Sequence, residues 1–140
     1  MSFANPSSEA IRRLLGAART IAVVGLSDNP QRPSHEVASA LLDFGYRIVP
    51  VNPMLAVWEG IRAVPDLGHA QQAAPEGIDI VNVFRRPEHI PAIVDDCIRL
   101  GMPALWLQLG VVDAAAALRA QQAGITVVMN RCIKVDLRIK

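Results

Sequence analysis

The sequence predicts an α/β protein of the Rossmann type, with a doubly wound five-stranded parallel sheet and helices on both of its faces. Two observations support this prediction. Short apolar segments alternate with segments whose apolar residues recur at helical spacing, which is typical of parallel strands joined by helices. The short segments also carry few polar residues, which indicates strands buried on both faces. In a chain of 140 residues, 51% of them hydrophobic, this pattern fits one domain.

The first half of the chain predicts two helices and two strands. Residues 8–18 carry apolar side chains at i, i+3, i+4 and i+7 behind a serine that can cap a helix, and residues 20–24 form an apolar strand. A second helix is expected from behind Pro33 to Gly45, because glycine is common just past a helix end. The strand of residues 47–51 follows.

Pro50 lies within this second strand. Because proline cannot donate to the hydrogen-bond ladder, it indicates an end position or an unpaired N–H. Residues 54–65 show no regular period, and Asp66 can cap a short helix that extends to about Ala74. We therefore expect an irregular segment and a short helix before the third strand.

The second half of the chain continues the alternation. It predicts a strand at 78–83, a helix with apolar residues between 90 and 98, a strand at 104–107, a helix capped by Asp113 and a strand at 125–128. Right-handed crossovers leave few strand orders. We expect the order 3-2-1-4-5, numbered along the chain, with the first strand at the centre.

The tail from Cys132 alternates apolar and polar side chains. This period is that of a half-buried strand, and a terminal helix or a contact with a partner stays open as an alternative. We expect the whole chain, 1–140, to form a single domain with its core at about residues 20–135.

The composition excludes several classes of function. The formal net charge is +1 without a basic block, so no nucleic-acid groove is expected. No apolar run reaches the roughly 18 residues of a membrane helix, and the first residues do not form a signal peptide, so we expect a cytoplasmic protein. Of the 14 basic residues only Lys134 and Lys140 are lysines, which excludes a Walker loop and a lysine Schiff base within the fold.

The candidate catalytic and metal-binding residues form no known pattern. Cys97 and Cys132 lack metal-ligand spacing, and Cys97 lies on the apolar face of a predicted helix, where a thiol packs. No serine lies in a nucleophile elbow. The histidines, His35, His69 and His89, lie near helix starts without the spacing of a metal site, so we expect surface or capping residues. Only His35 comes near the predicted ligand, and a phosphate contact is its functional alternative. We therefore expect a ligand-binding protein rather than an enzyme.

The candidate site lies beyond the carboxyl ends of the strands. An open parallel sheet binds ligands there, where the strand order reverses, and in the expected order this crevice lies between the first and fourth strands. The segments that follow the strands offer glycine for close backbone approach, amides, hydroxyls and arginines, which suit a polyanion. They are Gly25-Leu26-Ser27, Asn52-Pro53, Phe84-Arg85-Arg86, Gln108-Leu109-Gly110 and Asn130-Arg131.

The segment between Gly25 and Ser34 departs from a dinucleotide fingerprint, because it has one glycine where the fingerprint needs three. It still leads into a helix N-terminus, behind Arg32 and Pro33, whose free N–H groups can meet an anion. At the end of the second strand, Asn52 replaces the acidic residue that binds the ribose of NAD. A nucleotide ligand with a different ribose phosphate pattern therefore fits better than NAD.

Five blocks of the sequence resemble the small bacterial and archaeal CoA-binding proteins, which are similar to the N-terminal CoA-binding domain of the succinyl-CoA synthetase alpha subunit. The blocks are Gly25-Leu26-Ser27 with Arg32-Pro33-Ser34, then 49–53, 79–86, 105–110 and 128–133. The resemblance covers about residues 20–135. It implies a nucleotide-binding protein that holds coenzyme A or an acyl-CoA.

The resemblance also implies which residues contact the ligand. They are Gly25, Leu26 and Ser27 at the diphosphate with Arg32, Pro33 and Ser34 at the helix entry, Asn52 and Pro53 at the adenosine, Val83, Phe84, Arg85 and Arg86 on the opposite wall, Gln108 and Gly110 on the floor, and Asn130 in the last block. Relatives often carry a lysine after the Asn-Pro pair, whereas this chain has Met54. Arg32 or Arg86 is then the expected source of the missing charge.

Two other functions stay open. One is an NAD(P)-dependent oxidoreductase with an atypical glycine loop. The other is a non-catalytic interaction module that uses an exposed Trp58 and the apolar tail. A homodimer stays open as well, whereas nucleic acid and membranes are not expected as partners.

Overall fold

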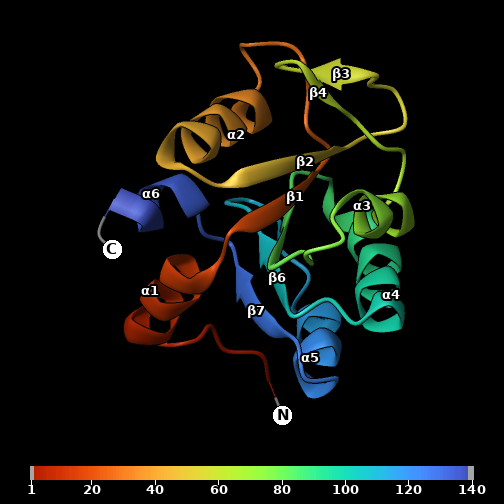
Figure 1. Cartoon of the computed structure of the whole chain (residues 1–140). Coiled ribbons are helices and arrows are strands. Elements are labelled where there is room, and N and C mark those ends of the chain that lie inside the picture. Colours follow the sequence, from red (N-terminus) through yellow and green to blue (C-terminus); the bar gives the residue numbers. More distant parts are fainter. Residues whose placement is uncertain (1, 139–140) are drawn as a thin grey trace.

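The structure, a computed structural model, describes residues 2–138 (Figure 1). In chain order its elements are α1 (Ser8–Ala17), β1 (Thr20–Val24), α2 (Pro33–Phe44), β2 (Arg47–Val51), β3 (Val57–Trp58), β4 (Ile61–Arg62), α3 (Leu67–Ala73), β5 (Ile80–Val83), the 3-10 helix η1 (Pro87–His89), α4 (Ile90–Leu100), β6 (Ala104–Leu107), α5 (Ala114–Gln122), β7 (Thr126–Met129) and α6 (Ile133–Arg138). No helix in this described part of the chain combines the length and the apolar character needed to cross a bilayer.

The sequence signals for helix ends are confirmed. The side chains of Ser7, Asp66 and Asp113 accept backbone N–H groups at the starts of α1, α3 and α5. Pro33 occupies the first turn of α2, and Gly45 ends that helix with φ at 111°. Local chemistry therefore sets where these helices begin and end.

The long strands form one parallel sheet in the order β2-β1-β5-β6-β7. This confirms the α/β class with a doubly wound, five-stranded parallel sheet. The expected order 3-2-1-4-5 is wrong, because the third of these strands along the chain, β5, lies between β1 and β6 and not outside β2.

Pro50 explains why β2 is an edge strand. The carbonyl of Val51 accepts the N–H of Gly25 at 2.8 Å on the β1 side, whereas the carbonyl of Pro50 accepts the N–H of Val64 at 2.9 Å on the outer side. The N–H that Pro50 lacks would therefore lie at the outer edge of the sheet, where no full strand needs it. The order 3-2-1-4-5 would have placed the third of these strands, β5, against this outer side of β2.

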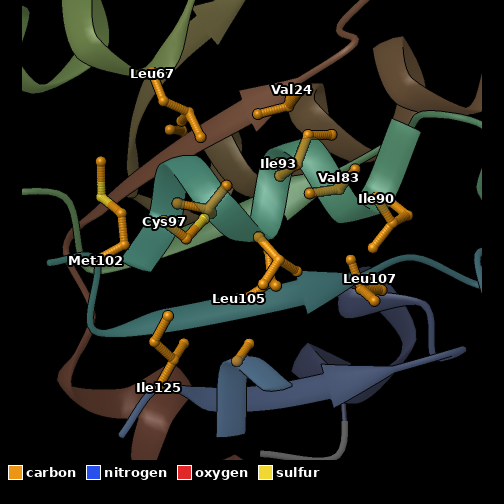
Figure 2. Packing of buried hydrophobic residues seen from close by; sticks show 14 of the residues in the cluster. Val24, Leu67, Val83, Ile90, Ile93, Cys97, Met102, Leu105, Leu107 and Ile125 are labelled. Atoms are coloured by element: carbon orange, nitrogen blue, oxygen red, sulfur yellow. The ribbon is translucent and has the colours of Figure 1, made fainter. Parts of the chain in front are cut away.

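Helices cover both faces of the sheet (Figure 1). α1, α2 and α6 pack on one face, and α3, α4 and α5 pack on the other. Residues of β1 alternate between the two cores, with Ile21 and Val23 on the first face and Ala22 and Val24 on the second. Figure 2 shows the second core, in which the side chain of Cys97 packs between α4 and the sheet. Packing on both faces accounts for the apolar strands.

The tail forms the helix α6, so the expected half-buried strand is wrong and the alternative of a terminal helix is found. Ile133 and Leu137, four residues apart, are buried in the core shared with α1 and α2. Val135, on the other side of the helix, is 56% exposed. This spacing of buried residues is helical. Ile139, which belonged to the alternating pattern, lies outside the described residues.

Asp136 is one of the polar residues in the alternating pattern of the tail. Its side chain is buried, and its two oxygens accept hydrogen bonds from Nε and Nη2 of Arg131 at 2.7 and 2.5 Å. This hydrogen bonding raises the pKa of Arg131 above its ordinary value. A buried carboxylate, paired with a partly exposed arginine, thus occupies a position that an alternating pattern assigns to solvent.

The segment expected to be irregular contains the antiparallel hairpin of β3 and β4. Trp58 in this hairpin is 1% exposed and packs with α2, so it offers no exposed contact surface for an interaction module. The ring of His35 on α2 meets the Trp58 ring edge to face, at 5.8 Å between centroids. Its Nε2 lies 3.4 Å from Oε1 of Glu59. His35 therefore contacts the hairpin.

Candidate functional site

A cavity of about 940 Å³ lies at the carboxyl ends of the strands. The strand order reverses between β1 and β5, and not between the first and fourth strands as the expected order required. The lining side chains come from the loops after β1, β5, β6 and β7 and from the facing helices α2 and α6. They are Gly25, Ser27, Arg32, Pro33, Ser34, Glu36, Val37, Phe84, Arg85, Arg86, Pro87, Gln108, Leu109, Gly110, Val111, Cys132, Lys134 and Val135.

Gly25 allows the loops after β1 and β5 to meet. Its φ is 85°, and a Cβ at this position would lie 2.5 Å from the carbonyl oxygen of Phe84 and 2.9 Å from Cδ of Arg85. Any other residue would have to displace the backbone of the neighbouring loop and adopt a strained conformation. The glycine is therefore required for the shape of the cavity wall.

The loop between β1 and α2 is held by its own side chains. The N–H of Ser27 donates to Oγ of Ser34 at 3.0 Å, and Oγ of Ser27 accepts the N–H of Asn29 at 3.0 Å. The N–H of Arg32 donates to the carbonyl of Asn29 at 3.0 Å. Arg32 is the N-cap of α2, and no side chain in the described chain caps this helix start. The loop is ordered and leaves the helix N-terminus facing the cavity edge.

The arginines that line the cavity carry charge that the chain does not neutralise. None of the ion pairs formed within residues 2–138 involves Arg32, Arg85 or Arg86. Nη2 of Arg85 lies 3.1 Å from Nε2 of His89, and a histidine does not cancel a guanidinium charge. This end of the cavity is therefore electropositive and offers planar donors to a phosphate.

The floor of the cavity is formed by the segment after β6. Oε1 of Gln108 accepts the N–H of Ile133 at 3.4 Å and Nδ2 of Asn82 at 3.2 Å, and Gln108 is only 6% exposed. The N–H of Gly110 donates to Oδ1 of Asn130 at 2.8 Å. The loops after β6 and β7 are thereby joined.

Another side of the cavity is formed by α6 and by the first turn of α2, which directly follows Arg32. Nζ of Lys134 lies 2.8 Å from Oε1 of Glu36, which links the two helices across the cavity. Cys132 is half-buried at the start of this wall. In the described part of the chain, no three histidine, cysteine or acidic side chains are placed to hold a metal ion.

Most of the residues predicted from the sequence line this cavity. They are Gly25, Ser27, Arg32, Pro33, Ser34, Phe84, Arg85, Arg86, Gln108 and Gly110. The others, Leu26, Asn52, Pro53, Val83 and Asn130, do not line it. His35, for which a phosphate contact was the functional alternative, does not line it either.

The predicted residues outside the lining have identifiable positions. Leu26 and Val83 are buried in the two cores. Nδ2 of Asn52 donates to the carbonyl of Leu26 at 3.0 Å, and its Oδ1 accepts the N–H of Met54 at 2.9 Å. Pro53 next to it is exposed. Asn52 thus connects the loops after β1 and β2.

Several lining residues were not predicted from the sequence. They are Glu36, Val37, Pro87, Leu109, Val111, Cys132, Lys134 and Val135. Leu109 was in a segment assigned to the crevice, but only its polar neighbours were selected. Lys134 and Val135 could have been found by their position in a helix that follows the last strand, because such a helix starts at the carboxyl edge of the sheet.

The comparisons with known proteins agree with one another. The model of the CoA binding domain family matches residues 19–138. The uncharacterized protein YneT of Bacillus subtilis (strain 168) is 43% identical over 131 residues, which are 94% of each chain. A structure of a Thermus thermophilus protein, cell-free ID.343, is similar at 34% identity and a TM-score of 0.86, over 96% of this chain and 98% of that one.

A similar fold also occurs inside a larger enzyme. The dinucleotide-forming acetyl-coenzyme A synthetase 1 of Ca. Korarchaeum cryptofilum is 21% identical, with a TM-score of 0.69, over 86% of this chain and 28% of that chain. At this identity the likeness shows the fold alone.

Proposed function

The chain belongs to the CoA-binding domain family, and on that premise we propose that it binds coenzyme A or an acyl-CoA in the cavity at the carboxyl edge of the sheet. The proposal is carried by one observation, the arginines around a cavity of about 940 Å³ that form no ion pair with a carboxylate of the described residues. Small-molecule sites occupy roughly 300–1,000 Å³. The cavity therefore has the size and the charge that a large polyphosphate nucleotide needs.

We propose that the diphosphate lies against Gly25 and the start of α2. A helix N-terminus presents N–H groups and partial positive charge, both of which favour phosphate. Pro33 has no N–H, and the N–H groups of His35 and Glu36 donate to the carbonyl of Arg32 at 3.1 and 3.3 Å. The N–H of Ser34, which no described hydrogen bond uses, is therefore the backbone donor proposed for the diphosphate at this helix start. The bare backbone at Gly25 lets a phosphate approach without a side chain in the way.

Arg32, Arg85 and Arg86 would neutralise the phosphates of the ligand. Guanidinium groups bind phosphate through paired hydrogen bonds, which are stronger than neutral ones. Met54, at the position where relatives often carry a lysine, is 90% exposed and has no charge. The arginines on the other loops are therefore the proposed source of positive charge in this chain.

The end of β2 supports coenzyme A over NAD. NAD-binding folds place an acidic side chain there for the ribose hydroxyls. Here Asn52 occupies that place, and both atoms of its amide are engaged with the backbone of Leu26 and Met54. We propose that Asn52 shapes the adenosine end indirectly, by holding the loop after β1.

We further propose binding without a reaction of the chain's own. Glu36 is paired with Lys134, and no described hydrogen bond joins Cys132 to a histidine or a carboxylate. An activated nucleophile needs such a neighbouring base.

A thermal shift panel tests the proposal. CoA at 100 times its dissociation constant should stabilise the fold by roughly 2.7 kcal/mol and raise the melting temperature accordingly. NAD and NADP at the same concentration should leave it unchanged. Stabilisation by NAD without stabilisation by CoA would contradict the proposed function.

A further inference from the structure

We infer that the form of coenzyme A bound here is a thioester with an aliphatic acyl group, whose chain lies at the end of the cavity formed by the β6 loop and α6. This inference rests on the proposed function, because the CoA moiety is what anchors the acyl group in the cavity.

The order of the strands separates the cavity into two chemically different ends. The loops after neighbouring strands follow one another along the sheet edge in the order β1, β5, β6 and β7. Arg32, Arg85 and Arg86 stand in the loops of the first pair, whereas Leu109, Val111 and the start of α6 belong to the second pair. A ligand that fills the cavity therefore extends from a cationic end to an apolar end.

Apolar side chains at the second end are left uncovered by the described chain. Leu109 is 66% exposed and Val135 is 56% exposed, and both line the cavity at this end together with the more buried Val111. Covering such side chains with an apolar group is favourable because apolar surface leaves water. The pattern of a few polar anchors beside apolar walls is typical of ligand sites.

The charges at this end favour a neutral acyl group over one that carries a carboxylate. Lys134 on α6 lies 2.8 Å from Glu36, which is in the first turn of α2, one turn after Arg32, so the charges of this pair largely cancel. A carboxylate on the acyl group, as in a succinyl thioester, would meet a cation that is already paired and an adjacent Glu36. A hydrocarbon chain has no such cost.

Gln108 provides a donor between the two ends. Its Oε1 must be the atom that faces Ile133, because the backbone N–H of Ile133 is a donor and points at it at 3.4 Å. Its Nε2 is therefore the remaining atom, and no hydrogen bond among the described residues uses it. The residue is buried and lines the cavity just after β6. This amide NH₂ group is placed to donate to a carbonyl oxygen of the pantetheine and thioester arm.

Calorimetric titration with CoA, acetyl-CoA, butyryl-CoA, hexanoyl-CoA and succinyl-CoA tests the inference. Each added methylene should increase affinity by about two- to fourfold, so hexanoyl-CoA should bind at least tenfold more tightly than acetyl-CoA. Succinyl-CoA should bind more weakly than butyryl-CoA, which has the same number of acyl carbons. Equal affinity across the series, or tighter binding of succinyl-CoA, would overturn the inference and leave the proposed function standing.

Failure of CoA and all of its thioesters to bind is a separate outcome. It would overturn the proposed function and, with it, the inference about the acyl group. Chain-length dependence therefore distinguishes the two.

Matched variants locate the acyl group. The double variant Leu109→Asn and Val135→Thr keeps the number and branching of the non-hydrogen side-chain atoms and removes apolar surface, so the ratio of hexanoyl-CoA to acetyl-CoA affinity should fall at least fivefold. Val112→Thr is the control, because Val112 is an exposed apolar residue that does not line the cavity. A ratio lowered equally by the control would overturn the proposed location.

Gln108→Glu tests the donor. The substitution keeps an oxygen for the N–H of Ile133 but removes the amide NH₂ donor, so affinity for hexanoyl-CoA should fall about tenfold. Near-ultraviolet circular dichroism reports whether the core stays intact. Unchanged affinity in a folded variant would overturn the role of Gln108.

Discussion

Arginines at the amino ends of the parallel strands, here called the amino edge of the sheet, make different contacts from those at the carboxyl ends, the carboxyl edge. At the amino edge, Arg47 forms an ion pair with Glu76 and donates to the carbonyl of Ala73 at 2.8 Å. At the carboxyl edge, Arg32 and Arg86 line a cavity and take part in none of the ion pairs of the described residues. Charges that are paired within the chain serve the fold, whereas charges left unpaired beside a cavity are expected to serve a ligand.

Glycine shows the same contrast. Gly45 at the amino edge has φ at 111°, and a Cβ there would meet nothing within 4 Å. Gly25 at the carboxyl edge has φ at 85°, and a Cβ there would lie 2.5 Å from the backbone of Phe84. The first glycine ends a helix, and the second allows two loops of the candidate site to touch.

The largest expected difference is between the rates at which iodoacetamide modifies the two cysteines. Burial, with the carboxylate of Asp96 as a second cause, raises the pKa of Cys97 to about 12. At pH 8 its thiolate fraction is then about 10⁻⁴. Iodoacetamide should therefore modify the half-buried Cys132 in the folded protein and leave Cys97 intact, as peptide mass spectrometry can show.

Bound CoA should slow the modification of Cys132, because this thiol lines the cavity. Unfolding the protein should make both cysteines reactive. Modification of Cys97 at a comparable rate in the folded protein would argue against the packing described, and a CoA-independent rate at Cys132 would argue against the site.

The next largest effect is expected from the arginines. Removing Arg32 and Arg86 together should weaken CoA binding by at least about 100-fold, since hydrogen bonds to charged groups contribute about 1.5–3 kcal/mol each. Arg47→Ala is the matched control and should leave CoA affinity within about twofold while costing at most about 1 kcal/mol of stability. Calorimetry measures the affinities, and equal losses in the two proteins would contradict the distinction between the edges.

Replacing Gly25 should lower the free energy of unfolding of the protein more than replacing Gly45. Gly25→Ala should cost about 2–4 kcal/mol, because strain at positive φ adds to a clash with the backbone of Phe84. Gly45→Ala should cost about 1–2 kcal/mol from strain alone. Urea denaturation gives both values. A loss at Gly25 no larger than at Gly45 would show that the two loops are not in close contact.

The fold could be predicted from the sequence wherever local signals agree with packing. Apolar runs marked the strands, and Ser7, Asp66, Asp113 and Gly45 marked helix ends. The strand order could not be predicted from these signals, because it depends on which strand edges pair. Pro50 carried the one clue, and its preference for an outer position was not applied to the order as a whole.

The site was predicted to the extent that it consists of polar residues directly after strands. The segments at Gly25, Phe84 and Gln108 meet around the cavity as expected. The apolar end was missed, because apolar residues outside a regular period give no local signal for a ligand. Lys134 and Val135 were missed because the tail alternates apolar and polar residues like a strand, although Asp136 is buried and Val135 is exposed in α6.

The smallest expected difference is in the stability lost when a residue at the start of α3 or of α2 is replaced. Asp66 caps α3, and its hydrogen bond from the N–H of His69 is the main cause that lowers the pKa of its carboxyl group. No described side chain caps α2, whose start faces the proposed diphosphate. Asp66→Ala should therefore destabilise the free protein by about 0.5–1 kcal/mol at pH 7, whereas Arg32→Ala should not remove a cap.

The effect of Asp66 should depend on pH in a definite direction. Its pKa in the folded protein lies below its value in the unfolded chain, so its contribution is complete above the unfolded value and is lost as pH falls through the folded value. Urea denaturation of the unsubstituted protein and of Asp66→Ala should give free energies of unfolding that converge as the pH falls below about 4. A constant difference down to pH 2 would contradict the role of the carboxylate.

Mass spectrometry of the small molecules released when the gently purified protein is denatured tests directly whether the protein binds coenzyme A. We expect coenzyme A or an acyl-CoA at an amount comparable with that of the protein, and less of it from the Arg32→Ala, Arg86→Ala variant than from Arg47→Ala. Release of NAD or NADP in place of a CoA compound would contradict the proposed function.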